Sequence, residues 1–371
     1  MRLVFDDEHD QLRASLRGFL EAKSPESEVR RLMATADGFD PEFWSLLAKD
    51  LELTALIVPE RFGGAGAGQR ELSVVFEEFG RAMTCAPLFA TVALATNVLL
   101  SSQDEQAKQR YLPGICDGTT RATLAHTERD RRWGPETVQS TATERDGKWS
   151  LTGRKAWVVD GATAELVLVT ARTAVGIGLF AVTAPAPGMS TEPAELIDQT
   201  RKYAHMRFDE VTAELIGGPG DSWPDIQRGL DLAAISLAAE QIGGAQRLLE
   251  MATQYAILRS QFGRAIGSFQ AIKHACTDLL LEVEGAKSAV YEASWTADED
   301  PAKLRVTASL AQAVSSQVYY QAAKTNIQIH GGIGFTWEHP AHLFYRRAKC
   351  SELYLGDPAH HRKVIAEQLG L

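Results

Sequence analysis

The sequence predicts a mostly α, α+β protein in three segments: an N-terminal helical domain, a middle antiparallel β domain and a C-terminal four-helix bundle. Apolar residues recur at helical spacing before about residue 110 and again after about residue 225. Between these stretches lie short apolar runs bounded by Gly and Pro, as expected for a small β domain. We expect the domain boundaries at 1–118, 119–222 and 223–371.

The N-terminal segment carries apolar residues at helical spacing, beginning with Leu12, Leu16 and Leu20. Asp40 followed by Pro41 is typical of a helix N-cap with proline at the first helical position. A further helix is expected over about 70–83, and the Gly-rich stretch 58–66 is expected to form a loop.

The middle segment has the short, punctuated apolar runs of β-strands. Trp149, Leu151 and the run 157–159 predict strands around a turn at Thr152-Gly153. The runs 166–169 and 177–182 predict two more strands.

Three long stretches of the C-terminal segment repeat small or apolar residues at alternating spacings of three and four. This sustained pattern predicts antiparallel helices packed in a bundle, and its many alanines permit close helix contact. The breaks fall at Pro301 and at Gly331-Gly332. The repeating positions are Ile235, Ala238, Ile242, Ala245, Leu249, Ala252 and Ala256; Ile272, Cys276, Leu279, Val283, Ala286, Val290 and Ala293; and Leu304, Ala308, Ala311, Ser315, Val318 and Ala322.

Charge and cysteine usage narrow the function classes. Lys and Arg total 38 against 48 Asp and Glu, a formal net charge of −10 without any basic block, which argues against nucleic acid or a membrane surface as the main partner. The sequence has no apolar run of transmembrane or signal-peptide length. Four widely spaced cysteines without a CxxC pair predict reduced thiols, so we expect a cytoplasmic protein.

Two interhelical segments could carry chemistry. The first, 259–270, offers the Arg259 guanidinium beside an aromatic ring and a Gly turn, and the second, 328–340, offers backbone N–H groups at Gly331 and Gly332. Both suit a pyrophosphate and an adenine ring, although two plain turns would explain the same residues. His339 and His342 share a helical spacing, but no motif supplies further metal ligands, so no metal site is expected.

Five motifs in order make the whole chain resemble the acyl-CoA dehydrogenase family of flavoproteins. The run 58–64 resembles its VPExxGG loop, Thr127-Glu128 its TE flavin motif and 153–158 its GxKxW strand, while 259–263 resembles RxQFG and 328–334 resembles QxxGGxG.

The resemblance implies bound FAD and oxidation of an acyl-CoA substrate to the 2,3-enoyl-CoA, with an electron-transfer flavoprotein-type acceptor. Thr127 and Trp157 would lie beside the flavin of their own subunit. The residues implied to reach a neighbouring subunit's FAD are Arg259, Phe262, Gln328, Gly331 and Gly332.

The sequence departs from this family at the catalytic base. Leu355 stands where most members carry Glu, and Ala233 occupies the alternative position, with Ala234 beside it. Neither Leu nor Ala can accept a proton. Val159 also replaces the Thr or Ser that usually bonds the flavin edge. Three carboxylates remain as candidates for a displaced base: Asp231, Glu240 and Asp357.

These departures leave three readings open. The chain resembles the base-less smaller subunit of heterotetrameric family members, which pairs with a related chain that carries the base. It could instead be a catalytic homotetramer with a displaced carboxylate. A flavin monooxygenase or oxidase on the same fold would need no Glu base at all.

Overall fold

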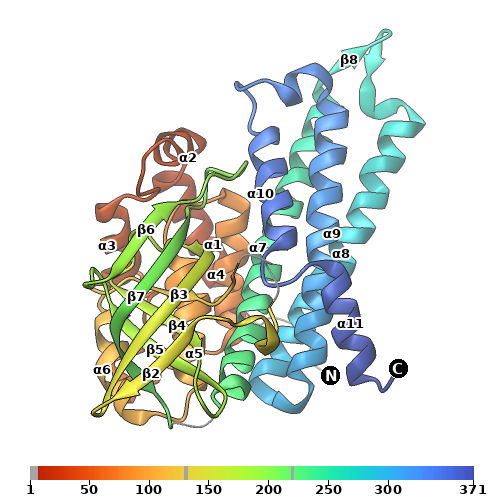
Figure 1. The fold of residues 1–371 in the computed structure, drawn as a ribbon. Coiled ribbons are helices and arrows are strands. Elements are labelled where there is room, and N and C mark those ends of the chain that lie inside the picture. Colours follow the sequence, from red (N-terminus) through yellow and green to blue (C-terminus); the bar gives the residue numbers. More distant parts are fainter. Residues whose placement is uncertain (1–6, 129–132, 219–220) are drawn as a thin grey trace. The chain divides into compact units, whose positions relative to one another are not determined.

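The computed structural model describes residues 7–128, 133–218 and 221–371, which form two compact units (Figure 1). The first unit comprises residues 7–31, 69–84 and 234–371, and the second comprises 32–68 and 85–233 within the described ranges. Helices of the first 118 residues are thus divided between both units. The domain boundaries after residues 118 and 222 remain a prediction from the sequence.

The first unit is helical. It contains α1 (Asp7–Lys23), most of α2 (Glu26–Met33), α4 (Gln69–Ala82), the later part of α7 (Trp223–Leu258), α8 (Gln270–Glu299), α9 (Leu304–His330), α10 (Ala341–Leu353) and α11 (Pro358–Gln368). Helices α8 and α9 run side by side, and α10 and α11 pack against α9 (Figure 1). The predicted stripe on α7 is buried along its whole length, and that on α8 is buried from Leu279 onward, which confirms the bundle.

Helices α4 and α7 approach closely because each places a glycine opposite the other's backbone. A Cβ on Gly80 would strike the carbonyl oxygen of Glu240, and one on Gly243 would strike that of Glu77. Only glycine permits this separation, so the two helices are locked in register.

The second unit surrounds a seven-stranded sheet. Its strands are β1 (Ala122–Ala125), β2 (Thr141–Arg145), β3 (Lys148–Val159), β4 (Leu166–Arg172), β5 (Ile177–Thr183), β6 (Met189–Pro193) and β7 (Tyr203–Ile216). Their order is β1-β4-β2-β3-β7-β5, with β6 beside β7, and β5 also pairs with β4. Val167, Phe180, Met206 and Phe208 form part of the core between the strands.

Helices of the second unit are α3 (Pro41–Lys49), α5 (Asn97–Ser101), α6 (Glu105–Cys116) and the start of α7, and a π-helix, Phe89–Thr96, leads into α5. Asp40 caps α3 as predicted, because its carboxylate accepts from the backbone N–H groups of Glu42 (2.9 Å) and Phe43 (3.0 Å).

The middle β domain is confirmed, with two corrections. The sheet is not wholly antiparallel, since β4 pairs parallel with both β1 and β2. Thr152-Gly153 is not a turn either: β3 continues through it with a register shift, and the hairpin turns at Asp146-Gly147, where both φ angles are positive (54° and 74°). Such a pair matches the twist of an antiparallel hairpin.

None of the helices within the described ranges is long and apolar enough to span a bilayer. The described residues also contain no group of three or more His, Cys, Asp or Glu side chains placed to hold a metal ion.

Candidate functional site

The structure places Thr127 directly beside the residue that precedes Trp157. Thr127 is buried, its hydroxyl donates to the carbonyl of Ala156 (2.6 Å), and the Ala156 N–H donates to the Thr127 carbonyl (2.8 Å). Trp157 is half-buried at a second bulge of β3, with φ 59°, and its ring meets His205 edge-on at 4.7 Å between centroids. The two predicted flavin contacts of the second unit therefore lie together.

A buried ion pair holds these segments. The Lys155 ammonium, whose side chain is fully buried, donates to Glu128 Oε1 (3.0 Å) and to the carbonyl of His126 (3.1 Å). Burial lowers the pKa of Lys155 to about 8, although Glu128 opposes this shift. Burial alone would raise the pKa of Glu128, but Lys155 and the backbone N–H of Ser140 lower it, so its carboxylate stays charged.

Sequence reasoning assigned no function to His126, which is part of the same buried cluster. Its Nδ1 lies 3.0 Å from the hydroxyl of Thr170, and its ring lies 5.5 Å from those of both Trp133 and Trp223. Burial and the nearby Lys155 lower its pKa to about 3, so it is neutral at physiological pH. The only signal in the sequence was its place directly before the Thr127-Glu128 motif.

In the helical unit, the Arg259 segment forms a protruding hairpin between α7 and α8. Strands β8 (Ser260–Gln261) and β9 (Arg264–Ala265) pair around Phe262 and Gly263, both at positive φ (53° and 78°), as a two-residue hairpin turn requires (Figure 1). Arg259 is exposed, and Phe262 exposes 91% of its surface.

The Gln328 segment lies at the same end of the unit, because Ile329 of α9 and Ile266 after the hairpin pack into one cluster. Gln328 is exposed at the last turn of α9, and a short 3₁₀ helix, Gly331–Phe335, follows. Gly331 and Gly332 are exposed, and no atom would meet a Cβ at either position. The exposed large apolar side chains on these two segments and at the adjoining end of α7 are Ile257, Leu258, Phe262, Ile333, Phe335 and Trp337.

Both positions expected for the base are buried and apolar. Ala233 is fully buried and Leu355 exposes 5% of its surface. Leu355 has φ 60°, a left-handed conformation that costs a non-glycine residue of order 1–3 kcal/mol. Three buried side chains hold the carbonyls around it: Gln241 donates to Ser351 (3.2 Å), Gln312 to Tyr354 (3.4 Å) and His361 Nε2 to Leu355 (3.1 Å).

Each carboxylate considered as a displaced base has a structural partner. Glu240 is buried and pairs with the buried Arg347 at 2.8 Å. Asp231 accepts from the amide of Gln227 (2.9 Å), and Asp357 is the exposed N-cap of α11, accepting from the His360 N–H (2.8 Å).

Comparison with known proteins gives a consistent picture. Models of the acyl-CoA dehydrogenase N-terminal, middle and C-terminal domains match residues 6–119, 123–211 and 220–370. The chain is 32% identical over 353 residues to the acyl-CoA dehydrogenase IpdE2 of Mycobacterium tuberculosis, covering 95% of this chain and 94% of the relative.

Two solved structures with the same fold each have a pair of names in their description. A chain of the ChsE4-ChsE5 complex from Mycobacterium tuberculosis superposes with a TM-score of 0.90 at 26% identity, covering 100% of this chain and 99% of that one. A chain of a variant of the steroid ACAD Tcur3481-Tcur3483 superposes with a TM-score of 0.89 at 28% identity, covering 98% of each.

Proposed function

Because the chain belongs to the acyl-CoA dehydrogenase family, whose members are flavoproteins, we propose that it is the base-less subunit of a heteromeric, FAD-dependent acyl-CoA dehydrogenase. One observation carries the proposal: both positions for the family's carboxylate hold buried apolar side chains, Ala233 and Leu355. A group that removes the α proton of a thioester must accept a proton within hydrogen-bond reach, and neither side chain can do so.

FAD, when bound, supplies the acceptor for the hydride that leaves the β carbon of the acyl-CoA. The residues of this chain fit the diphosphate part of that cofactor. Arg259 presents an exposed guanidinium, Gln328 an exposed amide, and Gly331 and Gly332 an open backbone. In this proposal they bind and orient the FAD of a related chain, which carries the catalytic carboxylate.

The exposed apolar side chains near these residues support a partner at this end of the helical unit. Phe262, Phe335 and Trp337 expose more than half of their surface, and large exposed aromatic groups mark protein interfaces. The ChsE4-ChsE5 complex, which contains a chain of the same fold, supports an assembly of this kind.

The partners of Glu240 and Asp357 disfavour these two carboxylates as a displaced base in a homotetramer. Glu240 is neutralised by Arg347, and Asp357 caps a helix. A base must bind and release a proton at the reacting carbon, and a carboxylate held in a buried ion pair is poorly suited to that exchange.

The test is expression of this chain alone and together with a related acyl-CoA dehydrogenase chain that carries the Glu. We expect flavin retention and acyl-CoA-dependent reduction of a dye acceptor only in the mixed assembly. Arg259→Ala in this chain should lower the flavin content of the assembly. Turnover of acyl-CoA by this chain alone, at the rate of the mixed assembly, would refute the proposal.

A second variant separates a missing base from a missing pocket. Leu355→Glu places a carboxylate at the family's position without altering the hydrogen bonds to the surrounding carbonyls. If this chain retains a competent flavin site of its own, the variant gains acyl-CoA-dependent flavin reduction. If the variant stays inactive while folded, this chain contributes only to its partner's site.

A further inference from the structure

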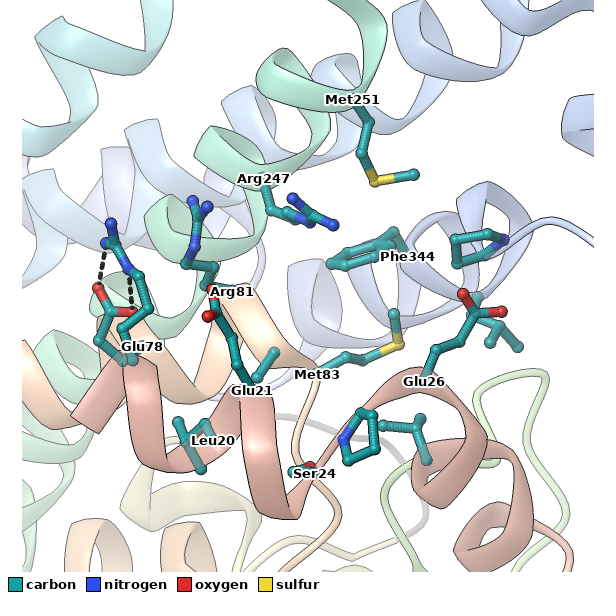
Figure 2. Close-up of a pocket in the computed structure, with 16 residues that line it drawn as sticks. Leu20, Glu21, Ser24, Glu26, Glu78, Arg81, Met83, Arg247, Met251 and Phe344 are labelled. Carbon is teal, nitrogen blue, oxygen red and sulfur yellow. Dashed lines mark hydrogen bonds and ion pairs between the residues drawn. The ribbon is translucent and has the colours of Figure 1, made fainter. Parts of the chain in front are cut away.

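A pocket of about 210 Å³ opens in the helical unit, lined by none of the residues expected to contact FAD (Figure 2). It lies among the ends of α1 and α4, the start of α2, the last third of α7 and the start of α10. A single water needs only about 10–15 Å³ of such space, so the pocket has room for a small organic molecule.

Of the three arginines that line this pocket, two form hydrogen-bonded ion pairs and the third does not. Arg17 binds Glu78 through two hydrogen bonds (2.6 and 2.9 Å), and Arg81 binds Glu250 through two more (2.6 and 2.8 Å). Arg247 is left with Glu250 Oε2 at 3.9 Å, beyond hydrogen-bond distance, and its side chain is 41% exposed. Within the described ranges it makes no hydrogen bond, so its donors are available.

The wall beneath Arg247 is apolar. Figure 2 shows the Arg247 side chain extending from α7 toward the ring of Phe344, with Met83 and Met251 on either side of that ring. Met83 has φ 53° at the residue after α4, where glycine is the usual choice. A large thioether side chain therefore occupies a strained backbone position and forms part of the pocket wall.

Two further carboxylates lie at the rim. Glu26 pairs with Arg30 at 2.7 Å, and Glu21 is exposed to solvent, where water and salt screen its charge. The partly exposed Arg247 guanidinium, with its free donors, thus lies against the apolar wall, whereas the carboxylates of Glu21 and Glu26 are screened or paired.

We propose that this pocket binds a small organic carboxylate with a short apolar chain, held by Arg247 through its carboxylate and by Met83, Met251 and Phe344 through its chain. A guanidinium offers two parallel donors that match a carboxylate, and methionine adapts to flexible apolar groups. The inference is independent of the proposed function, because it uses none of the residues assigned to FAD or to the base.

Hexanoate is the probe that tests the proposal, with hexan-1-ol, hexylammonium and inorganic phosphate as matched comparisons. Calorimetric titration of the full chain should show saturable hexanoate binding with a Kd of about 1 mM, the range for a ligand of this size. The alcohol, the cation and phosphate should bind at least about tenfold more weakly, since each lacks either the charge or the apolar chain.

Three variants assign the binding to this pocket. Arg247→Gln should weaken hexanoate binding by about tenfold or more, whereas Arg228→Gln, on the same helix but outside the pocket, should leave it unchanged. Met83→Gly removes the wall while suiting the positive φ, so it should weaken binding without unfolding the chain.

The proposal is overturned if Arg247→Gln binds hexanoate as well as the unmodified chain does, or if the folded chain shows no saturable binding. Equal affinity for hexan-1-ol would remove the role of Arg247, and equal affinity for phosphate would remove that of the apolar wall. Preferential binding of hexylammonium would reverse the assigned charge and refute the site.

Discussion

The ion pair between Glu240 and Arg347 offers the sharpest test of how the helical unit is stabilised. Both side chains are buried (5% and 4% exposed), and Glu240 Oε1 lies 2.8 Å from an Arg347 nitrogen. Glu240→Gln keeps the shape of the side chain but removes its charge. Removing one charge of a buried pair lowers the free energy of unfolding by about 3–5 kcal/mol, because the other charge stays buried without compensation.

That cost converts into a measurable melting shift. At about 2.1 cal/mol/K per residue, unfolding 371 residues has an entropy of about 0.8 kcal/mol/K, so a loss of about 4 kcal/mol lowers the melting temperature by about 5 °C. Differential scanning calorimetry of the folded assembly measures this shift. The double variant Glu240→Gln/Arg347→Met removes both charges and should recover most of the loss.

The same experiment separates structure from catalysis. A shift below about 1 °C for Glu240→Gln would refute the stabilising role of the pair. If flavin reduction by acyl-CoA also disappeared at that unchanged melting temperature, Glu240 would be acting as a base and the proposed function would be wrong.

Three other predictions use the same calorimetric measurement. Gly80→Ala should lower the melting temperature by several degrees, because its Cβ would strike the Glu240 carbonyl. The control Gly18→Ala, on an open face of α1, should raise the melting temperature by about 1 °C. Equal shifts for the two variants would contradict the close α4–α7 contact. The pKa of Lys155 is about 8 in the folded chain against 10.5 ordinarily, so the unfolded chain binds more protons between pH 8 and 10.5 and stability rises with pH across that window, by up to about 3 kcal/mol. The melting temperature of the unmodified chain minus that of Lys155→Met should therefore grow from pH 8 to 10, and a constant difference would count against burial as the cause. The pKa of His126 is about 3 against 6.5, so the unfolded chain binds more protons between these values and stability falls on acidification; His126→Phe should lose less stability than the unmodified chain between pH 7 and 5, and an equal loss would show that His126 does not contribute.

Features governed by neighbouring residues could be predicted from the sequence. The cap at Asp40 and the buried stripe of α7 depend on spacings within one helix, which the sequence displays directly. The prediction of a hairpin turn at Thr152-Gly153 is wrong, and Asp146-Gly147, a strong turn signal, lies six residues earlier. Gly153 instead serves a bulge, where a Cβ would strike Ser140.

Contacts between distant residues were beyond sequence reasoning. Glu128 and Lys155 each belong to a recognised motif, but their burial as a pair follows from the meeting of β3 with the segment after β1. The free donors of Arg247 likewise follow from a contact between helices, because Arg81 of α4 binds both carboxylate oxygens of Glu250.

The sequence alone determined that the usual base is missing, because accepting a proton is a property of the side chain itself and neither Leu355 nor Ala233 has that property. Only the tertiary structure decided the state of the remaining carboxylates. The sequence shows no partner for Glu240, yet the folded chain buries it against Arg347, which is more than 100 residues later in the sequence. Whether a charged group is available for chemistry depends on its desolvation and its partners, and folding sets both.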